Sequence, residues 1–364
     1  MANTEQRRDK LRKLLKKTEA DALLVTQEQN VTYLTGFTGD SSYLLLTPKE
    51  ELILSDKRYT TQLEEECGDL KFEVRGPELK MHEHLAEVAK RMKIGTLGFE
   101  SQHVSVATHA AWSKQLKNVE LAPTTDLVEQ LRMIKDKEEV QIICDSVACA
   151  QRAFEVIRAS LRPEQTEKQV ADLLEAQVRL FGGECTSFPP IIAVGPRAAL
   201  PHARPGQPKI GDDDFVLIDW GARYRGYASD LTRILVTGKI SPKLQKVYGV
   251  VAKAQSLAIA AIRHGASMKD VDAAARNSIA KAGFGKQFGH GLGHGIGLQI
   301  HESPRMGPKE DAPLKAGMVV TVEPGVYIPG WGGVRLEDDV LVTKTGAKVL
   351  TSVTKELEEC IVGG

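Results

Sequence analysis

Short apolar runs and one helical pattern alternate in the first third of the chain. The runs at 22–25, 42–46 and 51–54 are bounded by Gly, Asp or Pro, which is typical of β-strands. At 84–92 apolar residues recur three or four positions apart, which predicts a helix. The first 17 residues read as an amphipathic helix, not a signal peptide, because they lack an apolar stretch. These elements predict a small α/β domain.

Longer helical patterns dominate the rest of the chain. The turn and capping cluster at 122–126 is the best domain boundary, so we expect domains at 1–124 and 125–364. Three helices should end at glycines, at 182–183, 265 and 283, since Gly is common just beyond a helix C-terminus. Helical spacing is found at 127–134, 140–154, 169–180, 244–263 and 268–282. We expect these helices to form hydrophobic core and assign them no chemistry.

Two segments, 215–238 and 319–346, share one pattern of apolar and acidic positions. Each begins with an apolar strand that ends in an acid and continues through a glycine-containing turn with a tyrosine. A second acid then opens a second strand, so both segments are predicted to be hairpins and to form a weak two-fold repeat. The acids are Asp219 and Asp230 in the first segment, and Glu323 with one of Glu337, Asp338 or Asp339 in the second.

Composition narrows the class of protein. The 364 residues are 42% hydrophobic and 26% charged, as in an ordinary globular protein and not a disordered one. The 48 basic and 48 acidic residues balance, which disfavours nucleic acid or an anionic membrane as partner. No run approaches the length of a membrane span. The five scattered cysteines form no C-x-x-C pair, which favours a reducing compartment, and we expect a cytoplasmic protein.

A glycine-rich stretch at 288–302 carries the histidines His290, His294 and His301. Glycines let a backbone approach a ligand closely, and imidazole is both a common metal ligand and a common general acid or base. The alternative is a flexible loop with incidental histidines. The histidines of the first domain lack clustered acids and are expected to be surface or packing residues: His82, His84, His103 and His109.

An acid within an apolar strand is costly to bury unless it is paired. Two divalent ions carry four positive charges, which would balance four facing carboxylates, and one neutral imidazole would add a nitrogen ligand. The expected ligands are Asp219, Asp230, His294, Glu323 and Glu337. Such a set suits manganese, cobalt or iron, and a pair of these ions activates water and polarises a carbonyl.

The alternative to a metal centre is that each acid pairs with a nearby arginine in a surface hairpin. The candidate arginines are Arg223, Arg225, Arg233 and Arg335. Neighbouring residues of a strand point to opposite faces. Spacing alone therefore leaves open which of the acids 337–339 points inward.

At these residues the chain resembles the metallopeptidases of the pita-bread fold, in the branch of Xaa-Pro dipeptidases (prolidases) and Xaa-Pro aminopeptidases. The resemblance extends over essentially the whole chain and implies a small α/β N-terminal domain followed by a pita-bread catalytic domain, an α+β protein overall. The matching motifs are I-D-W-G-A at 218–222, S-D-L-T-R at 229–233, G-H-G-I-G at 293–297, V-E-P-G-V-Y at 322–327, G-G-V-R-L-E-D-D at 332–339, N-V-T-Y-L-T-G-F-T-G-D at 30–40 and D-K-R-Y at 56–59.

The resemblance implies roles for individual residues. Asp219 and Asp230 would hold one ion and His294 and Glu323 the other, with Asp230 and Glu337 bridging. Glu323 would also carry a proton. His202 and His301 would act on the substrate and transition state. The remaining implied substrate-binding residues are His290, Arg305 and Arg335. Residues 203–206 depart from the family, whose members more often have small or polar residues after the histidine.

The implied reaction is hydrolysis of the Xaa-Pro bond at the N-terminus of a dipeptide or short peptide by a homodimeric enzyme with two divalent ions. Manganese is the expected metal, with cobalt or zinc as alternatives. Two other activities on this fold are a metal-free, creatinase-like amidine hydrolysis and non-catalytic binding. The presence of all five ligand residues disfavours both. The sequence does not decide between a dipeptidase and an aminopeptidase.

Overall fold

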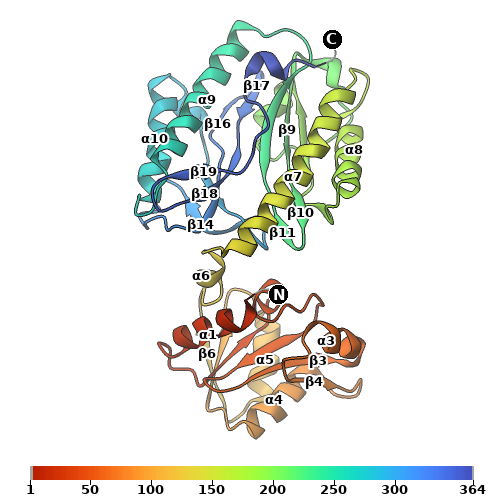
Figure 1. Cartoon of the computed structure of the whole chain (residues 1–364), viewed down its shortest axis with the longest axis vertical. Coiled ribbons are helices and arrows are strands. Elements are labelled where there is room, and N and C mark those ends of the chain that lie inside the picture. Colours follow the sequence, from red (N-terminus) through yellow and green to blue (C-terminus); the bar gives the residue numbers. More distant parts are fainter. Residues whose placement is uncertain (1–2, 363–364) are drawn as a thin grey trace. The chain divides into compact units, whose positions relative to one another are not determined.

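The computed structural model describes residues 3–362 and divides the chain into two compact units, 1–132 and 133–364 (Figure 1). The boundary predicted after residue 124 coincides with the end of a strand, β6 (Glu120–Thr124). One further short helix, α6 (Glu129–Arg132), belongs to the first unit.

The first unit is built on a six-stranded sheet with the order β4-β3-β2-β1-β5-β6. The central strands β1, β2 and β3 pair antiparallel, whereas β4, β5 and β6 add parallel. The three predicted strands and the predicted helix are confirmed. The remaining bounds are β1 (Ala22–Val25), β2 (Tyr43–Leu46), β3 (Glu51–Asp56), β4 (Phe72–Arg75), β5 (Thr96–Glu100), α1 (Thr4–Leu15), α2 (Glu28–Thr35), α3 (Thr60–Glu66), α4 (Met81–Arg91) and α5 (Val106–Gln115).

Four long helices frame the second unit, and the predicted helical patterns correspond to them. They are α7 (Lys137–Ser160), α8 (Glu167–Leu180), α9 (Pro242–Ala261) and α10 (Met268–Lys281). Helix α7 begins at a capping box in which Asp136 and Glu139 each accept the backbone N–H of the other. This box explains why the apolar pattern of residues 127–154 divides into the short α6 and the separate α7.

Both predicted hairpins are confirmed as long antiparallel strand pairs. In the first, β9 (Phe215–Trp220) pairs with β12 (Leu231–Val236), and in the second, β15 (Val319–Val322) pairs with β18 (Asp338–Val342). Each pair encloses a smaller hairpin, which the sequence pattern did not predict. The enclosed pairs are β10 (Ala222–Tyr224) with β11 (Tyr227–Ala228), and β16 (Gly325–Ile328) with β17 (Gly332–Arg335).

The remaining strands extend these two pairs into sheets. One sheet has the order β12-β9-β8, and the other has the order β14-β13-β15-β18-β19. The short β7 pairs with β10. Their bounds are β7 (Cys185–Thr186), β8 (Ile191–Val194), β13 (Gly293–Gly295), β14 (Glu302–Met306) and β19 (Ala347–Val349).

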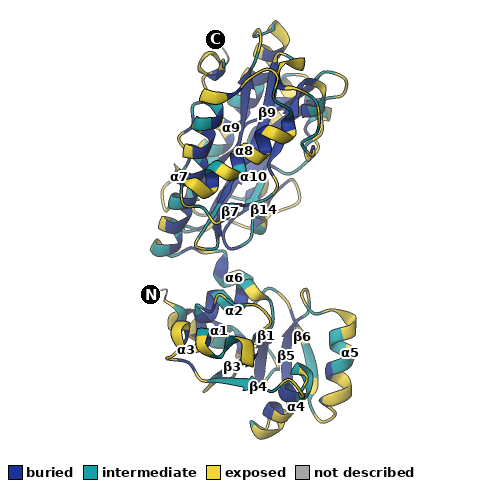
Figure 2. Cartoon of the chain, turned by 90° about the vertical axis from the view of Figure 1, so that its right-hand side faces the viewer, coloured by how far each residue is buried: buried dark blue, intermediate teal, exposed yellow. Residues whose placement is uncertain are grey.

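The helices cover the sheets of the second unit from two sides, with α7 and α8 on one and α9 and α10 on the other (Figure 1). Each helix buries one face against the strands and exposes the other (Figure 2). On the α7 side, the rings of Phe154 and Trp220 stack with centroids 4.2 Å apart. Within residues 3–362, none of the helices combines the length and the apolar character needed to cross a bilayer.

Candidate metal centre

Asp219 and Asp230 lie on the β9–β12 pair, as the hairpin prediction required. Asp219 is in β9 and faces Thr232 across the ladder, while Asp230 immediately precedes β12. Their exposed fractions are 7% and 5%, so both carboxyl groups are removed from water. A hydrophobic strand thus carries each acid into the interior, where it needs a cationic partner.

The other acids come from the β15–β18 pair. An isolated β-bridge joins this strand pair to the β9–β12 pair. Glu323 follows β15 and Glu337 precedes β18. Residue 337 forms an isolated β-bridge with Thr232, whose Oγ1 donates a hydrogen bond of 2.6 Å to Glu337 Oε2. This contact brings the acids of the two halves together.

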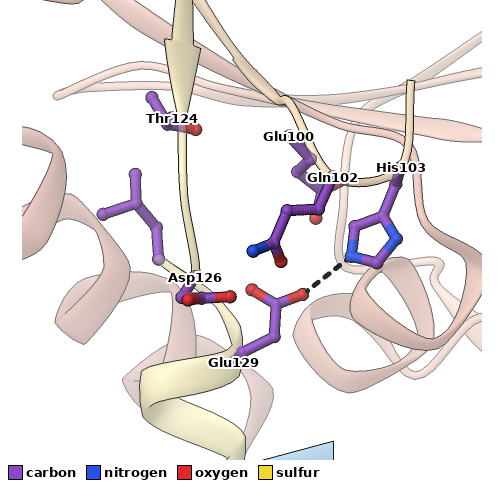
Figure 3. Close-up of a pocket in the computed structure, with 7 residues that line it drawn as sticks. Glu100, Gln102, His103, Thr124, Asp126 and Glu129 are labelled. Atoms are coloured by element: carbon purple, nitrogen blue, oxygen red, sulfur yellow. Dashed lines mark hydrogen bonds and ion pairs between the residues drawn. The ribbon is translucent and has the colours of Figure 1, made fainter. Parts of the chain in front are cut away.

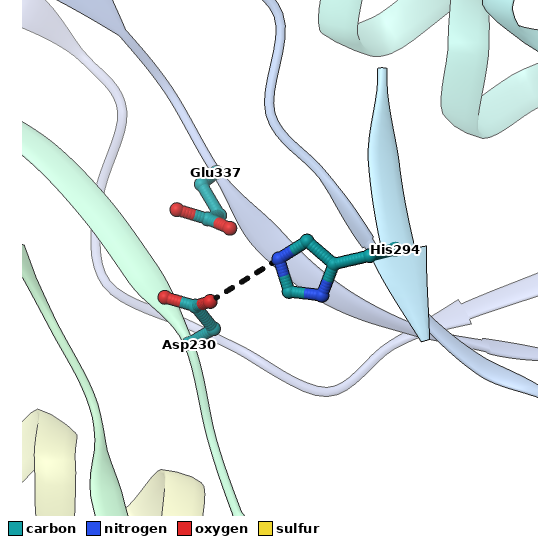
Figure 4. Close-up of side chains that lie close together, drawn as sticks. All are labelled: Asp230, His294 and Glu337. Atoms are coloured by element: carbon teal, nitrogen blue, oxygen red, sulfur yellow. Dashed lines mark ion pairs between the residues drawn. The ribbon is translucent and has the colours of Figure 1, made fainter. Parts of the chain in front are cut away.

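The structure gathers three of the predicted ligands into one group. The ligand atoms of Asp230, His294 and Glu337 all lie within 4.8 Å of one another (Figure 4). His294 Nε2 is 3.6 Å from Asp230 Oδ2 and 3.4 Å from Glu323 Oε1. Four of the five predicted ligands therefore converge, and Asp219 is the remaining one.

Asp219 contacts an arginine from the enclosed hairpin β16–β17. Arg335 Nη2 donates to Asp219 Oδ2, and the same guanidinium donates to Tyr327 Oη at 2.9 Å and to Thr232 Oγ1 at 3.0 Å. His290 Nε2 lies 2.9 Å from Tyr327 Oη. Asp219 therefore has an arginine partner, as the alternative expects, but the pair is buried and not in a surface hairpin, and among the described residues Oδ1 of Asp219 has no hydrogen-bond donor.

Tyr327 was not predicted as a site residue, although the tyrosine after V-E-P-G was part of the repeated pattern. It joins His290 to Arg335, and its burial raises the pKa of its phenol to about 12. The phenol therefore keeps its proton in the neutral pH range. Its place depends on the β16–β17 pairing, which the sequence pattern did not show.

The structure shows which of the three consecutive acids points toward the centre. Glu337 does so, whereas Asp338 accepts from Arg233 Nη2 at 2.8 Å and from Thr351 Oγ1 at 2.6 Å. Lys355 contacts the other oxygen of Asp338. The charges of Arg233 and Lys355 outweigh burial and lower the pKa of Asp338. Asp338 is therefore a paired structural carboxylate.

The other candidate arginines and the third acid have separate partners. Asp339 Oδ2 accepts the backbone N–H of Asp230 at 3.0 Å. Arg223 donates to the carbonyls of Gly226 and Leu298, and Arg225 lies 3.8 Å from Glu138. The acid–arginine alternative therefore does not hold for Asp230 or Glu337.

The remaining predicted residues lie around the acids. The ring of His301 is 4.3 Å from that of His294, centroid to centroid. His202 is exposed, and the carbonyl of the preceding Pro201 accepts a hydrogen bond of 3.4 Å from Nη1 of Arg335. Arg305 is exposed opposite His294 in the β13–β14 ladder.

The acid beside His301 pairs with a lysine. Glu302 forms a buried ion pair with Lys135, whose Nζ lies 2.7 Å from Oε1. A lysine from the segment before α7 therefore neutralises Glu302. The imidazole of His301 lies instead against that of His294, one of the predicted metal ligands.

Burial and mutual repulsion dominate the electrostatics of the centre. Burial raises the pKa of Asp230 well above its ordinary value, and the charges of Glu337 and Asp219 add to the effect. Burial likewise raises the pKa of Glu337 strongly and that of Glu323 to about 7. Within residues 3–362, Oδ1 of Asp219 and Oδ1 of Asp230 are buried without a hydrogen-bond donor. Arg335 offsets one of these charges, at Asp219, and the group of acceptors keeps an excess of negative charge.

His294 completes a donor set that fits a divalent cation. Burial, helped by the charge of His301, lowers the pKa of His294 to about 3, so its imidazole is neutral. Its Nδ1 lies 3.1 Å from the carbonyl of Gly295, which assigns the proton to Nδ1 and leaves the lone pair of Nε2 facing the carboxylates. Carboxylate oxygens with one imidazole nitrogen are ligands for manganese, iron or cobalt, and also for zinc.

The first unit also contains a group of acids, but hydrogen bonds already satisfy most of it. They line a small pocket of about 10 Å³ (Figure 3). Glu100 accepts from the backbone of Thr26 and from Asn30, and Glu129 accepts from Asn30 and contacts His103 Nε2 at 3.2 Å. His103 is exposed, as predicted, but it has acidic neighbours, which the spacing along the chain did not indicate.

The pKa values predict how pH affects the stability of the metal-free protein. Glu323, with a pKa raised from 4.5 to about 7, stabilises the fold below pH 4.5, and this contribution is lost as the pH rises through 7. The lowered pKa values of His294 and His290, about 3 and about 4, act oppositely, but only up to about pH 6.5. We therefore expect the free energy of unfolding to fall as the pH rises from about 6.5 through 7, and the raised pKa values of Asp230 and Glu337 act in the same direction.

For each proton that the native state binds and the unfolded state does not, the free energy of unfolding falls by about 1.4 kcal/mol per unit rise in pH. A saturating divalent cation should remove the fall, because it replaces those protons. Urea unfolding of chelated and manganese-loaded protein at several pH values measures both. Identical pH profiles for the two forms would contradict the electrostatic description.

The fold and this carboxylate–imidazole centre define a metal-dependent hydrolase. Residues 141–344 match metallopeptidase family M24, and residues 7–134 match the creatinase/prolidase N-terminal domain. The chain belongs to metallopeptidase family M24, whose members use divalent metal ions to hydrolyse peptides. The predicted family and fold class are confirmed.

Relatives and solved structures extend over nearly the whole chain. An Xaa-Pro dipeptidase of Pyrococcus furiosus is 35% identical over 97% of this chain and 99% of its own length. The structure of an Xaa-Pro dipeptidase from Bacillus anthracis matches with a TM-score of 0.94 and 37% identity, covering 98% and 99%. An X-Pro aminopeptidase from Thermotoga maritima matches with a TM-score of 0.88 and 33% identity, covering 96% and 99%.

Proposed function

We propose that this peptidase hydrolyses the Xaa-Pro bond at the N-terminus of dipeptides or short peptides. The observation that carries the proposal is the convergence of Asp230, His294 and Glu337 within 4.8 Å, with Glu323 next to His294. The choice of the Xaa-Pro bond as the one hydrolysed rests on the relatives. Two Xaa-Pro dipeptidases and an X-Pro aminopeptidase match nearly the whole chain.

Five residues would hold two divalent ions, with manganese as the proposed metal and cobalt or zinc as alternatives. Asp219 and Asp230 would bind one ion, and His294 and Glu323 the other. Asp230 and Glu337 would bridge them, which agrees with their place between the two strand pairs. When bound, such ions activate water and polarise the scissile carbonyl.

Glu323 is the proposed proton carrier of the reaction. Its Oε1 lies 3.4 Å from Nε2 of His294, so the carboxyl is next to the proposed ligands. Thr321 Oγ1 donates to Oε1 at 3.2 Å, which fixes the side chain and leaves Oε2 to carry the proton. The leaving nitrogen of a peptide bond must receive a proton when the bond breaks, and for proline this proton becomes the only N–H of the neutral amine.

The surrounding histidines and arginines would bind and orient the peptide. His202 and His301, both exposed, would donate a hydrogen bond to the developing oxyanion. Arg305 would contact the carboxyl end of the substrate. His290 and Arg335, joined by Tyr327, would fix the position of Asp219 and line the substrate site.

A chelation experiment tests the function. Hydrolysis of Ala-Pro is measured for the purified protein, after removal of metal, and after manganese is added back. We expect chelation to lower the rate at least about tenfold and manganese to restore it. Full activity without metal would favour a creatinase-like reaction and refute the metal mechanism. Metal binding without hydrolysis of any Xaa-Pro peptide would indicate a binding protein.

The length of the substrate is a separate question. Comparing the turnover of Ala-Pro with that of Ala-Pro-Ala separates a dipeptidase from an aminopeptidase. We also propose a cytoplasmic homodimer. All five cysteines are free, which supports a reducing compartment. Light scattering of the purified protein measures the oligomeric state.

A further inference from the structure

Glu167, the first residue of α8, is a buried carboxylate outside the metal centre. Its side chain is completely inaccessible, with an exposed fraction of 0%. It accepts hydrogen bonds from the backbone N–H of Val194 at 2.9 Å, the backbone N–H of Gly206 at 2.9 Å and Nε of Arg197 at 2.9 Å. These donors are what allow a charge to be buried.

All three donors belong to one loop. Val194 ends β8, and Gly206 lies on the far side of His202, so Glu167 ties the two ends of the loop 195–206 to each other. Arg197 also donates from Nη2 to the carbonyl of Arg204 at 2.6 Å. The ion pair Glu167–Arg197 therefore holds the loop on both sides of its histidine.

The middle of the same loop reaches the metal centre. Arg335, which contacts Asp219, also donates from Nη1 to the carbonyl of Pro201 at 3.4 Å. Ala203 is buried in the core with 4% exposure, whereas the intervening His202 is exposed. His202 is thus presented from a backbone that is fixed before and after it.

An acid in the first turn of a helix commonly serves the helix alone, because it interacts favourably with the helix dipole from an exposed position. Glu167 differs, since it is buried and its oxygens are directed at the loop. Thr166 already caps α8 through a reciprocal contact with Gln169. The helix therefore begins without help from Glu167.

We propose that Glu167 and Arg197 are positioning residues that hold His202 at the substrate. The inference rests on the proposed function, in which His202 acts on the oxyanion. The proposal also gives a role to residues 203–206, the segment that departs from the family pattern. Ala203 contributes a buried methyl group, Arg204 a carbonyl and Gly206 an N–H. Their backbone atoms, and not the side chain of Arg204, make the contacts with Glu167 and Arg197.

Arg197 is the better residue to change, because Glu167 is fully buried and its variants combine a folding defect with any effect on His202. The side chain of Arg197 is 34% exposed. Arg197→Met removes the ion pair and the contact with residue 204, and Arg197→Lys keeps only the charge. Arg179→Met is the matched control, since Arg179 forms an exposed ion pair with Glu175 on the same helix.

A double-mutant cycle tests whether Arg197 acts through His202. We expect Arg197→Met to lower kcat for Ala-Pro about tenfold with unchanged metal content, because small displacements of a catalytic group are costly. Arg197→Lys should be similarly impaired, and Arg179→Met should not. In the His202→Ala background, Arg197→Met should have no further effect. Additive losses in the double variant, or normal kcat in Arg197→Met, would overturn the proposal.

Amide hydrogen exchange separates this inference from the proposed function. Arg197→Met should increase exchange in residues 198–206 and leave the β9–β12 ladder protected. If wild-type protein cleaves no Xaa-Pro peptide while this increase is observed, the proposed function fails and the loop-holding role stands. Unchanged exchange in the loop would refute the role of Arg197 whatever the activity.

Discussion

Asp230→Asn is expected to lower kcat for Xaa-Pro hydrolysis by about 10³-fold, or about 4 kcal/mol in activation free energy. The substitution keeps the size of the side chain and removes one negative charge from the position between the two proposed ions. It should also lower the bound metal below two ions per chain. Steady-state kinetics with Ala-Pro and metal analysis of the same preparation measure both effects.

The stability of the metal-free variant should change in the opposite direction. Burial and neighbouring carboxylates raise the pKa of Asp230 well above its ordinary value, so its charge destabilises the metal-free fold. Metal-free Asp230→Asn should therefore unfold at higher urea concentration than metal-free wild type at pH 8. Asp172→Asn, an exposed change on α8, is the control and should alter neither quantity. Near-normal turnover with two ions bound would exclude a bridging role.

Glu323→Gln is expected to lower kcat by about 10²- to 10³-fold, the usual range for loss of a general acid or base. The amide keeps an oxygen that can bind a cation, but it cannot receive and return a proton. Metal content should therefore fall less than in Asp230→Asn, while KM changes little. Kinetics over a range of pH, together with metal analysis, separate the loss of proton transfer from the loss of an ion.

Glu310→Gln provides the comparison for Glu323→Gln. Glu310 is an exposed acid of the same half of the unit, so its substitution should leave kcat and metal content unchanged. If Glu323→Gln turned over Ala-Pro within a few-fold of wild type while holding both ions, another group would have to carry the proton.

The residue pattern was sufficient to predict the elements that carry the acids. An apolar strand that carries Asp219 or leads into Glu323 predicts that the acid is buried, because the apolar side chains and the acid enter the interior together. The enclosed hairpin β16–β17 was not predictable in this way. Its pairing of Gly325 with Arg335 joins residues whose contact depends on a turn, and the contacts of Tyr327 follow from that turn.

The choice among residues 337–339 shows a similar limit. Strand alternation separates Asp338 from its two neighbours but cannot say which face is inward. The ladder with β15, in which Val322 faces Asp338, and the bridge between Thr232 and Glu337 decide it. The partners of Glu167 were not predictable for the same reason. They lie in and beside the loop 195–206, almost thirty residues further along the chain. Helical spacing marked α8 only as core.

The bridge between Thr232 and Glu337 lies on the seam between two halves of the second unit. Asp219 and Asp230 belong to the first half, and His294, Glu323 and Glu337 belong to the second, so neither half alone holds a complete set of ligands. A pair of ions at this seam acts as a cross-link that only the assembled unit can form. Binding free energy of such an ion is folding free energy. Removal of the proposed ions should therefore lower the free energy that holds the two halves together, as well as stop turnover.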